Sequence, residues 1–320
     1  MSVLVVDKPV GPTSYDVVRR VQRALARLWH LPRPRDLKVG HGGTLDPLAS
    51  GVLPVCIGEA TKLAPFLLDA DKEYDALVRF GVETDTLDAA GVVLAESPTD
   101  GLDGAAVAAA LAPFRGAITQ VPPMYSALKH QGRALYSYAR AGQEITRPAR
   151  ALTIHELELV AWQPPATARL RVRCSKGTYV RVLAADLGRA LGTGAHLAGL
   201  RRTASGPFNL AQAHPLDEIE RAVAAGELPR LVGLAEALAH LPAFAPGAEA
   251  AAALWQGKKL AAGDLGLPED ATGRFRVLRA DGSLLAVAAA EGGVVRTLRG
   301  FQPASAGLAS DSSGRSGQAG

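Results

Sequence analysis

Cysteine is scarce in this chain of 320 residues, which contains only Cys56 and Cys174. The two thiols lack the Cys-x-x-Cys spacing and the other spacings typical of metal ligands. The sequence therefore argues against a disulfide framework and against a metal site, and it predicts two reduced, mostly buried thiols.

Long apolar runs are absent as well, although 48% of the residues are hydrophobic. No run reaches the ~18 residues that would span a bilayer. The N-terminus leads into Asp7 and Lys8 without the pattern of a secretory signal. We therefore expect a cytoplasmic protein that makes no membrane contact. At ~150 residues per domain, the chain has room for one large domain and a small one.

Acidic residues are few in one third of the chain. Between Arg115 and Arg202 there are 14 Lys plus Arg against 4 Asp plus Glu, a net charge of +10, whereas the remainder carries −6. A second positive stretch within residues 17–41 contains Arg19, Arg20, Arg23, Arg27, Arg33, Arg35 and Lys38. This distribution predicts a polyanionic partner. Arginine supplies 27 of the 35 basic residues. That bias suits phosphate binding and base stacking in RNA, but genomic base composition explains it equally well.

Apolar periodicity predicts both strands and helices over the first 242 residues. The expected strands cover residues 3–6, 52–57, 74–81, 152–160 and 168–174. The first expected helix follows a cap at Thr13 or Ser14 and has apolar residues at helical spacing up to Leu28, and further helices are expected at 60–68, 103–113 and 179–191. The last two strands should pair with each other. Residues 119–150 differ in character, because they are basic and contain an aromatic helix in which Tyr136 and Tyr138 look exposed. We interpret this segment as an insertion that folds over RNA.

After residue 242 the chain changes to short strand-like pieces separated by glycine turns. The pair Asp281-Gly282, between two apolar dipeptides, is a strong hairpin signal. Residues 243–303 are therefore interpreted as a separate β domain. Residues 304–320 are rich in Ser, Gly and Ala and should be disordered.

The most informative segment is glycine-rich and carries a single carboxylate. Residues 40–48 read GHGGTLDPL, which places Asp46 on a loop between apolar segments. A lone aspartate in such a loop is usually a turn residue. Four further blocks change this interpretation, because they occur together with it in a particular order.

The five blocks resemble the TruB family, the bacterial tRNA pseudouridine-55 synthases. They read DKPVGPTS at 7–14, GHGGTLDPLASGVLP at 40–54, DKEY at 71–74 with TDTLD at 84–88, PPMYSALK at 122–129, and CSKGTYVR at 174–181. The resemblance implies an α+β (mixed α/β) pseudouridine synthase fold over residues 1–242, with a central, largely antiparallel sheet flanked by helices. It also implies a small PUA-like RNA-binding β domain over residues 243–303, for which a generic β module is the alternative.

The resemblance implies isomerisation of uridine-55 in the T-loop of tRNA. Making pseudouridine breaks the bond from the ribose to N1, rotates the uracil and rejoins it through C5. Because no redox change or net addition of water occurs, no cofactor is required. A carboxylate nucleophile can attack either the ribose C1′ or the base C6, and the sequence does not choose between them. The family's pattern assigns this role to Asp46.

Three further residues are assigned to the support of Asp46 by their positions in the matching blocks. A catalytic carboxylate needs a fixed, mostly dry site and a cationic partner. The resemblance makes Arg181 that partner, for which the alternative is a surface ion pair of little energetic value. It makes Tyr179 a polar contact near the site, and Lys8 a support for the Asp46 loop.

RNA contacts are assigned in the same way. The target uridine lies in a folded loop, so it must be flipped out and stacked in a pocket. Tyr74 matches the stacking aromatic, Leu200 an apolar wall, and His41 the residue that fills the space left by the flipped nucleotide. As alternatives, Tyr74 and Leu200 would be ordinary core residues. The expected phosphate contacts are Lys129, Arg140, Arg147 and Arg150.

Two other function classes were compared with this one. A non-catalytic RNA-binding or tRNA-folding protein would use the same basic surface, and it is the alternative hypothesis. A zinc deaminase is excluded, because the Pro-Cys-x-x-Cys ligand pattern is missing. The expected partner is the T-arm stem-loop of tRNA. We expect no obligatory protein partner and a chain able to act as a monomer.

Overall fold

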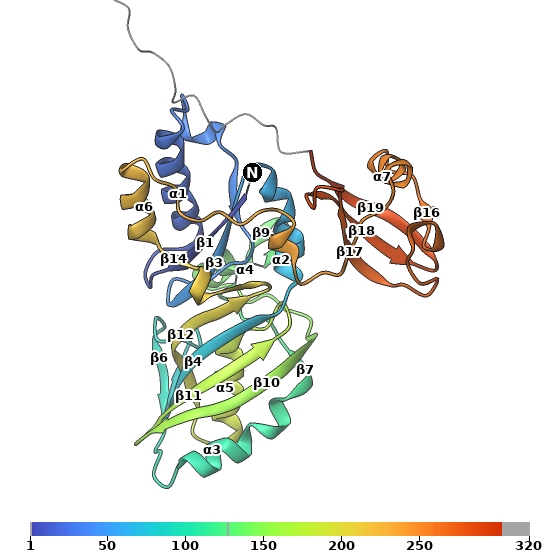
Figure 1. Ribbon diagram of the computed structural model, residues 1–320. Helices are drawn as coiled ribbons and strands as arrows, with labels where there is room; N and C mark the ends of the chain where they lie inside the picture. Colours follow the sequence, from blue (N-terminus) through green and yellow to red (C-terminus); the bar gives the residue numbers. More distant parts are fainter. Residues whose placement is uncertain (1, 127, 303–320) are drawn as a thin grey trace, which may run out of the picture. The chain divides into compact units, whose positions relative to one another are not determined.

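The computed structural model describes residues 2–126 and 128–302 (Figure 1). The expected disordered tail, residues 304–320, lies outside the described residues. The chain divides into two compact units, one of Ser2–Val232 and one that begins at Gly233. The first unit closes where Val232 and Val3 exchange two backbone hydrogen bonds of 2.8 Å. This point comes earlier than the boundary at residue 242 that the change in sequence character suggested.

A ten-stranded sheet forms the centre of the first unit. Its strands are β1 (Ser2–Lys8), β2 (Val39–His41), β3 (Ala49–Ile57), β4 (Lys72–Phe80), β7 (Gly116–Gln120), β10 (Arg150–Gln163), β11 (Thr167–Cys174), β12 (Ala195–Ser205), β13 (Phe208–Asn209) and β14 (His214–Pro215). The main order is β14-β1-β3-β12-β4-β11-β10-β7. Only the pairs β1–β14 and β3–β12 are parallel among the described strands of this sheet. The prediction of a mixed fold with a largely antiparallel central sheet is therefore confirmed.

Helices and two small hairpins complete this unit. The helices are α1 (Ser14–Leu28), α2 (Ala64–Asp69), α3 (Gly104–Ala110), α4 (Leu135–Arg140), α5 (Val180–Ala190) and α6 (Leu216–Ala224). The hairpins pair β5 (Val82–Thr84) with β6 (Val93–Glu96) and β8 (Lys129–His130) with β9 (Arg133–Ala134). Short 3₁₀ turns are η1 (Pro34–Asp36), η2 (Gly58–Leu63), η3 (Ala112–Phe114) and η4 (Leu210–Gln212). No helix in the described ranges is long and apolar enough to cross a membrane.

The first predicted helix is confirmed, and of the two predicted caps it is Thr13 that caps it. Thr13 Oγ1 accepts from the Asp16 backbone N–H, and the Asp16 carboxylate accepts from the Thr13 backbone N–H. The expected helix at 60–68 is instead η2 followed by α2, with Pro65 in the first turn of α2. Proline fits a helix start and not a helix interior, which explains the division.

Two apolar clusters pack on this sheet. Helices α1 and α6 lie side by side and cover strands β1 and β3 (Figure 1). Helices α3 and α5 pack on strands β4, β10, β11 and β12. Two partly buried residues, Tyr74 on β4 and Leu200 on β12, pack against both clusters. The middle of the sheet, where these two residues lie, is thus the place where the two halves of the core meet.

The basic insertion at residues 119–150 contains the small hairpin and α4. Tyr136 on α4 is exposed, as expected. Tyr138 is buried, so its expected exposure is wrong. Its ring makes an edge contact with His130, and the Arg133 guanidinium lies 4.9 Å from its centroid. Tyr138 therefore holds the hairpin against the helix.

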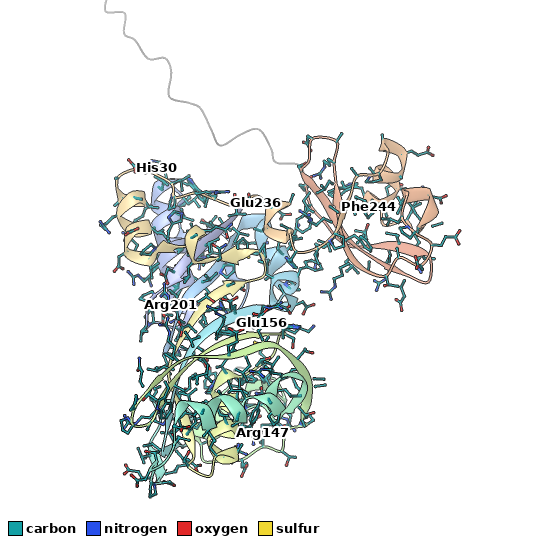
Figure 2. The ribbon with its side chains drawn as sticks, turned by 60° about the horizontal axis from the view of Figure 1, so that its bottom comes forward. His30, Arg147, Glu156, Arg201, Glu236 and Phe244 are labelled. Atoms are coloured by element: carbon teal, nitrogen blue, oxygen red, sulfur yellow. The ribbon has the colours of Figure 1, made fainter. Side chains whose placement is uncertain are left out.

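The second unit contains a five-stranded sheet in the order β15-β17-β18-β19-β16. Its elements are β15 (Ala243–Phe244), α7 (Ala248–Trp255), β16 (Leu260–Ala261), β17 (Gly273–Leu278), β18 (Leu284–Glu291) and β19 (Val294–Gly300), with 3₁₀ turns η5 (Glu236–Leu238) and η6 (Gly263–Leu265). The predicted Asp281-Gly282 hairpin is confirmed as the β17–β18 turn, where Gly282 has φ +78°. Phe244 packs edge-on against Phe275 in its core (Figure 2).

Candidate active site

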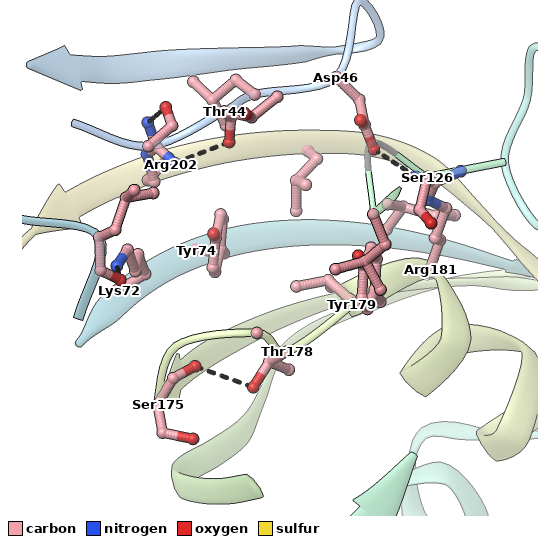
Figure 3. A pocket seen from close by; sticks show the side chains of 18 residues that line it. Thr44, Asp46, Lys72, Tyr74, Ser126, Ser175, Thr178, Tyr179, Arg181 and Arg202 are labelled. Atoms are coloured by element: carbon pink, nitrogen blue, oxygen red, sulfur yellow. Dashed lines mark hydrogen bonds and ion pairs between the residues drawn. The ribbon is translucent and has the colours of Figure 1, made fainter. Parts of the chain in front are cut away.

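A pocket of about 490 Å³ opens on the middle of the large sheet (Figure 3). Its walls come from the Asp46 loop, from β4, from the segment before α5 and from β12. The lining includes Gly43, Thr44, Leu45, Asp46, Lys72, Tyr74, Ser126, Ser175, Thr178, Tyr179, Arg181, Leu200 and Arg202. Residues that the sequence places far apart, including Asp46, Tyr74, Tyr179, Arg181 and Leu200, are therefore neighbours.

Asp46 and Arg181 form an ion pair at this pocket. The Asp46 Oδ2 lies 2.9 Å from the Arg181 Nη2 (Figure 3). The Asp46 side chain is 45% exposed, whereas that of Arg181 is only 7% exposed. A buried cation thus faces a carboxylate that solvent, and therefore a substrate, can reach. The pairing that the sequence resemblance implied is present in the geometry.

Asp88 holds Arg181 from its buried side. Its Oδ2 lies 3.8 Å from Arg181 Nη1. The Asp88 Oδ1 accepts hydrogen bonds from Thr86 Oγ1 (2.6 Å) and from the Ala90 backbone N–H (3.1 Å). The guanidinium therefore lies between two carboxylates, of which only Asp46 is accessible. Sequence reasoning included Asp88 in a matching block but gave it no role.

Arg202 is a site residue that sequence reasoning missed. It is fully buried on β12 at 1% exposure. Its guanidinium donates to the carbonyls of Val52 (2.7 Å), Thr44 (3.2 Å) and Gly43 (3.1 Å). Burial lowers the pKa of Arg202, and the neighbouring Tyr74 hydroxyl partly offsets this. The guanidinium of this one side chain therefore ties the segment before Asp46 to strand β3, which follows Asp46.

Gly51 makes this arrangement sterically possible. It lies opposite Arg202 in the parallel pairing of β3 with β12, and its φ is +103°. A Cβ at this position would lie 2.2 Å from the Arg202 carbonyl oxygen. Only glycine lets β12 approach so closely.

Tyr74 and Leu200 lie in the pocket, as expected. Tyr74 is opposite Arg202 in the β4–β12 register. Burial raises the pKa of Tyr74, and the charge of Arg202 opposes that shift. The phenol is therefore neutral at ordinary pH. An aromatic ring beside an aliphatic wall forms a surface on which a planar base can stack.

Tyr179 precedes α5 and is fixed through its backbone. Its N–H donates to Gln120 Oε1 at 3.1 Å, and the Arg181 guanidinium lies 5.9 Å from its ring centroid. Burial raises the pKa of its phenol, and the charge of Arg181 opposes that shift. The residue lines the pocket next to the ion pair.

His41 does not line the pocket. It ends β2, opposite Val55. Its Nδ1 is buried and finds no hydrogen-bond partner in residues 2–126 and 128–302. Burial lowers its pKa, and the charge of Arg202 acts in the same direction. The imidazole is therefore uncharged at neutral pH.

Two buried lysines support the site. Lys8 Nζ donates to the carbonyls of Ala49 (2.6 Å) and Pro9 (2.9 Å), so it holds the end of the Asp46 loop. Lys72 lines the pocket and donates to the carbonyls of Leu68 and Ala70. Burial lowers the pKa of each lysine to about 8; Asp46 opposes the shift of Lys8.

The lowered pKa of Lys72 predicts a pH dependence of stability. Its ordinary pKa is 10.5, whereas burial reduces it to about 8 in the fold. Between these values the unfolded chain binds more protons, so stability rises with pH. The free energy of unfolding of wild type relative to Lys72→Met is therefore expected to increase from about pH 8 to about pH 10.5 and to be flat below. Urea titrations across this range measure it.

Lys62→Met is the matched control, because Lys62 is paired with Glu59 and more exposed. The two variants must be compared with each other because the buried thiols of Cys56 and Cys174 make the free energy of unfolding fall as the pH rises, which opposes the effect of Lys72. Burial raises the pKa of their thiols to about 12 and about 11. A slope that is the same in Lys72→Met and Lys62→Met would contradict the prediction.

The expected phosphate contacts differ in their surroundings. Lys129, Arg140 and Arg150 are exposed. Arg147, labelled in Figure 2, is only 17% exposed. It lies 3.6 Å from Glu144 and lines a separate pocket. Among the described residues, no cluster of three or more His, Cys, Asp and Glu could hold a metal ion.

Comparisons with known proteins agree with this geometry. The family model described as "TruB family pseudouridylate synthase (N terminal domain)" matches residues 32–180. The model described as "tRNA pseudouridylate synthase B C-terminal domain" matches residues 181–238. The N-terminal model thus covers the Asp46 loop and Tyr74, and the C-terminal model covers Arg181 and Arg202.

Individual relatives extend the match over most of the chain. This chain is 48% identical over 295 residues to tRNA pseudouridine synthase B of Burkholderia mallei (strain NCTC 10247). The matched residues cover 92% of this chain and 94% of the relative. This chain is 49% identical over 265 residues to the protein of the same name from Cupriavidus pinatubonensis (strain JMP 134 / LMG 1197), covering 82% and 81%.

The solved structures give the same fold. The structure described as "Crystal Structure of a Cbf5-Nop10-Gar1 Complex" superimposes with a TM-score of 0.72 at 27% identity, covering 94% of this chain and 85% of that one. A second, "Structure of H/ACA RNP bound to a substrate RNA containing 2'-deoxyuridine", gives a TM-score of 0.69 at 25% identity, covering 94% and 85%.

Proposed function

The chain belongs to the TruB family of tRNA pseudouridine synthases, and from that premise we propose that it isomerises uridine-55 in the T-loop of tRNA with Asp46 as the nucleophile. The observation that carries the proposal is the accessible Asp46 carboxylate, 2.9 Å from a buried arginine in the lining of a pocket of about 490 Å³. The family is one of isomerases; the position modified and the nucleophile are the parts proposed here.

The reaction uses the pocket in a defined way. The flipped uracil stacks on Tyr74 and lies against Leu200, which offsets the few kcal/mol that unstacking costs. The Asp46 carboxylate attacks either the ribose C1′ or the base C6, and the N1–C1′ bond breaks. After the uracil turns, C5 bonds to C1′, and the bond between the Asp46 oxygen and C1′ or C6 breaks, which regenerates the carboxylate. The C5 proton leaves to solvent, and N1 gains a proton. Atoms balance without a co-reactant.

The other pocket residues support this chemistry without reacting. Arg181 fixes the orientation of Asp46 and is itself fixed by Asp88. Arg202 and Lys8 hold the carbonyls of the Asp46 loop. This support leaves the carboxylate preorganised towards the substrate. A protein that only binds RNA would not need a carboxylate held in this way, which favours an enzyme over the non-catalytic alternative.

Other parts of the chain fit the same proposal. His41 lies five positions before Asp46 and has a buried, unpartnered Nδ1 within the described residues. It fills the space that the flipped nucleotide leaves. Lys129, Arg140 and Arg150 are exposed on or beside the basic insertion and contact phosphates, with Arg147 in a less exposed position.

The unit from Gly233 is proposed to be a PUA-like RNA-binding domain, because its small β sheet follows a catalytic unit that acts on RNA. Since tRNA is the substrate, the enzyme works in the cytoplasm. Because Asp46, Arg181 and Tyr74 all belong to this chain, we propose that a monomer can carry out the reaction without a protein partner.

The position modified is tested with two T-arm RNAs, one tritiated at C5 of uridine-55 and one tritiated only at the other uridines. Replacing the C5 hydrogen by C1′ releases the label to water. Release is expected from the first RNA alone. Release from the second RNA alone would contradict the assignment of uridine-55. A folded protein that binds both RNAs and releases no label would favour the non-catalytic alternative.

A further inference from the structure

Helix α1 carries a row of cationic side chains outside the pocket. Tyr15, Arg19, Arg23 and Arg27 follow one another at intervals of four residues, and all four are exposed. We call these four residues the α1 stripe. The opposite side of the helix carries Val17, Val21 and Leu25, which are buried in the core. The stripe is thus the solvent side of a helix whose orientation is fixed.

The arginines of the stripe are not neutralised by acidic neighbours. Within residues 2–126 and 128–302, Arg19, Arg23 and Arg27 form no ion pair. The acidic residue of the helix, Asp16, is engaged in the N-terminal cap: hydrogen bonding from Thr13 is the largest cause of its lowered pKa, and the charge of Arg19 is the smallest. Three positive charges therefore face solvent on one helix.

Arg20, next to Arg19, shows the contrast. Its guanidinium lies 2.7 Å from Asp217 and 2.6 Å from Glu220, both on α6. Helix α6 lies beside α1 (Figure 1). Hydrogen bonding from Arg20 is the largest cause of the lowered pKa of Glu220, and the charge of Arg27 adds the smallest contribution. The fold thus uses the acidic residues of α6 to neutralise Arg20 and leaves the stripe unpaired.

The start of α1 is tied directly to the Asp46 loop. Ser14 Oγ accepts from the Leu45 N–H (2.8 Å) and donates to the Leu45 carbonyl (3.0 Å). The Gly11 N–H donates to the Pro47 carbonyl at 2.9 Å. The residues on both sides of Asp46 are therefore bonded to the segment that begins the helix. An RNA whose nucleotide enters the pocket comes close to the first turn of α1.

The spacing of the stripe suits a strand of phosphates. Each step of four residues advances about 6 Å along the helix axis and turns slightly about it, which is comparable to the separation of successive phosphates in one RNA strand. The Arg19 guanidinium lies 5.9 Å from the Tyr15 ring centroid, so the first step is held by a cation–π contact. A protein surface that carries positive charge and has no apolar centre is typical of a nucleic-acid-binding site and atypical of a protein–protein interface.

We propose that the α1 stripe binds the phosphate backbone of tRNA beside the flipped nucleotide, as an anchoring surface separate from the basic insertion at residues 119–150. The inference rests on the proposed function, because it takes tRNA as the molecule that enters the pocket. The stripe contributes affinity and its salt dependence, and it takes no part in the chemistry.

The test compares wild type, the triple variant Arg19→Ala/Arg23→Ala/Arg27→Ala and the control Arg20→Ala. Affinity for full-length tRNA is measured by filter binding between about 50 and 200 mM salt. The triple variant should bind about tenfold more weakly at the lower salt, and its salt slope should be smaller by about 2. The control should keep the wild-type slope. Alanine favours helix, and circular dichroism verifies that the variants are folded.

A triple variant with the affinity and slope of wild type would overturn the proposal. Tritium release at saturating RNA, measured in parallel, separates this result from a failure of the proposed function. If no variant and no wild-type protein released tritium, the enzyme assignment would fail, while the binding slopes would still decide the role of the stripe. Retained release at saturation in the triple variant is expected, because Asp46 and its supports are unchanged.

Discussion

An Asp46→Asn enzyme is expected to release tritium from C5-labelled T-arm RNA at least ~10³-fold more slowly than wild type, because loss of a covalent nucleophile removes the reaction path and leaves only binding. An amide has nearly the same shape as a carboxylate but cannot form the ester or adduct. RNA affinity should change by less than about threefold, since the phosphate contacts lie elsewhere. Single-turnover release and filter binding measure the two quantities separately.

Asp75→Asn is the matched control for this experiment. Asp75 follows Tyr74 on β4, but it is paired with Arg169 and does not line the pocket. It should retain the wild-type rate. An Asp46→Asn enzyme that keeps a rate within tenfold of wild type would exclude Asp46 as the nucleophile.

The second large effect is on stability. Arg202→Ala is expected to lower the free energy of unfolding of the catalytic unit by about 3 kcal/mol or more, because it leaves buried carbonyls without donors and creates a cavity. The carbonyls are those of Gly43, Thr44 and Val52. Arg202→Lys should recover only part of the loss, since an ammonium does not reproduce the planar fork of a guanidinium.

Urea unfolding followed by tryptophan fluorescence measures this loss. In a Trp255→Phe background the remaining tryptophans, Trp29 and Trp162, report on the catalytic unit alone. Arg201→Ala is the control, because the neighbouring Arg201 side chain is 42% exposed and paired with Asp7. It should cost at most about 1 kcal/mol. Equal losses for the two arginines would show that burial of Arg202 contributes nothing.

The sequence was sufficient to predict most of the pocket residues, because they stand in the blocks that resemble the family. Asp46, Tyr74 and Arg181 stand in separate blocks, and the sheet brings them together as the family resemblance implied. The supports were harder to predict. Arg201 and Arg202 look like one basic pair in the sequence. Because side chains alternate along a strand, however, Arg201 points to solvent and Arg202 points into the core. The sequence contains that signal only after β12 has been recognised as a strand through this position.

Other differences have equally local causes. Asp85 and Asp88 lie in the same block, and nothing in it says which carboxylate turns inward to Arg181. Tyr136 and Tyr138 were both expected to be exposed. Only the hairpin β8–β9, whose residues His130 and Arg133 contact the Tyr138 ring, explains why that ring is buried. Contacts between distant segments decided these cases, and periodicity carries no information about them.

The parallel pairing of β3 with β12 has a consequence for protein synthesis. The Asp46 loop enters β3 early in the chain, whereas Leu200 and Arg202 arrive only with β12. Parallel strands need a long crossover, and such non-local pairing forms slowly. A nascent chain that ends before β12 contains Asp46 but not the arginine that holds its loop. We therefore expect nascent chains and fragments that end before β12 to be inactive until nearly the whole unit Ser2–Val232 has been synthesised.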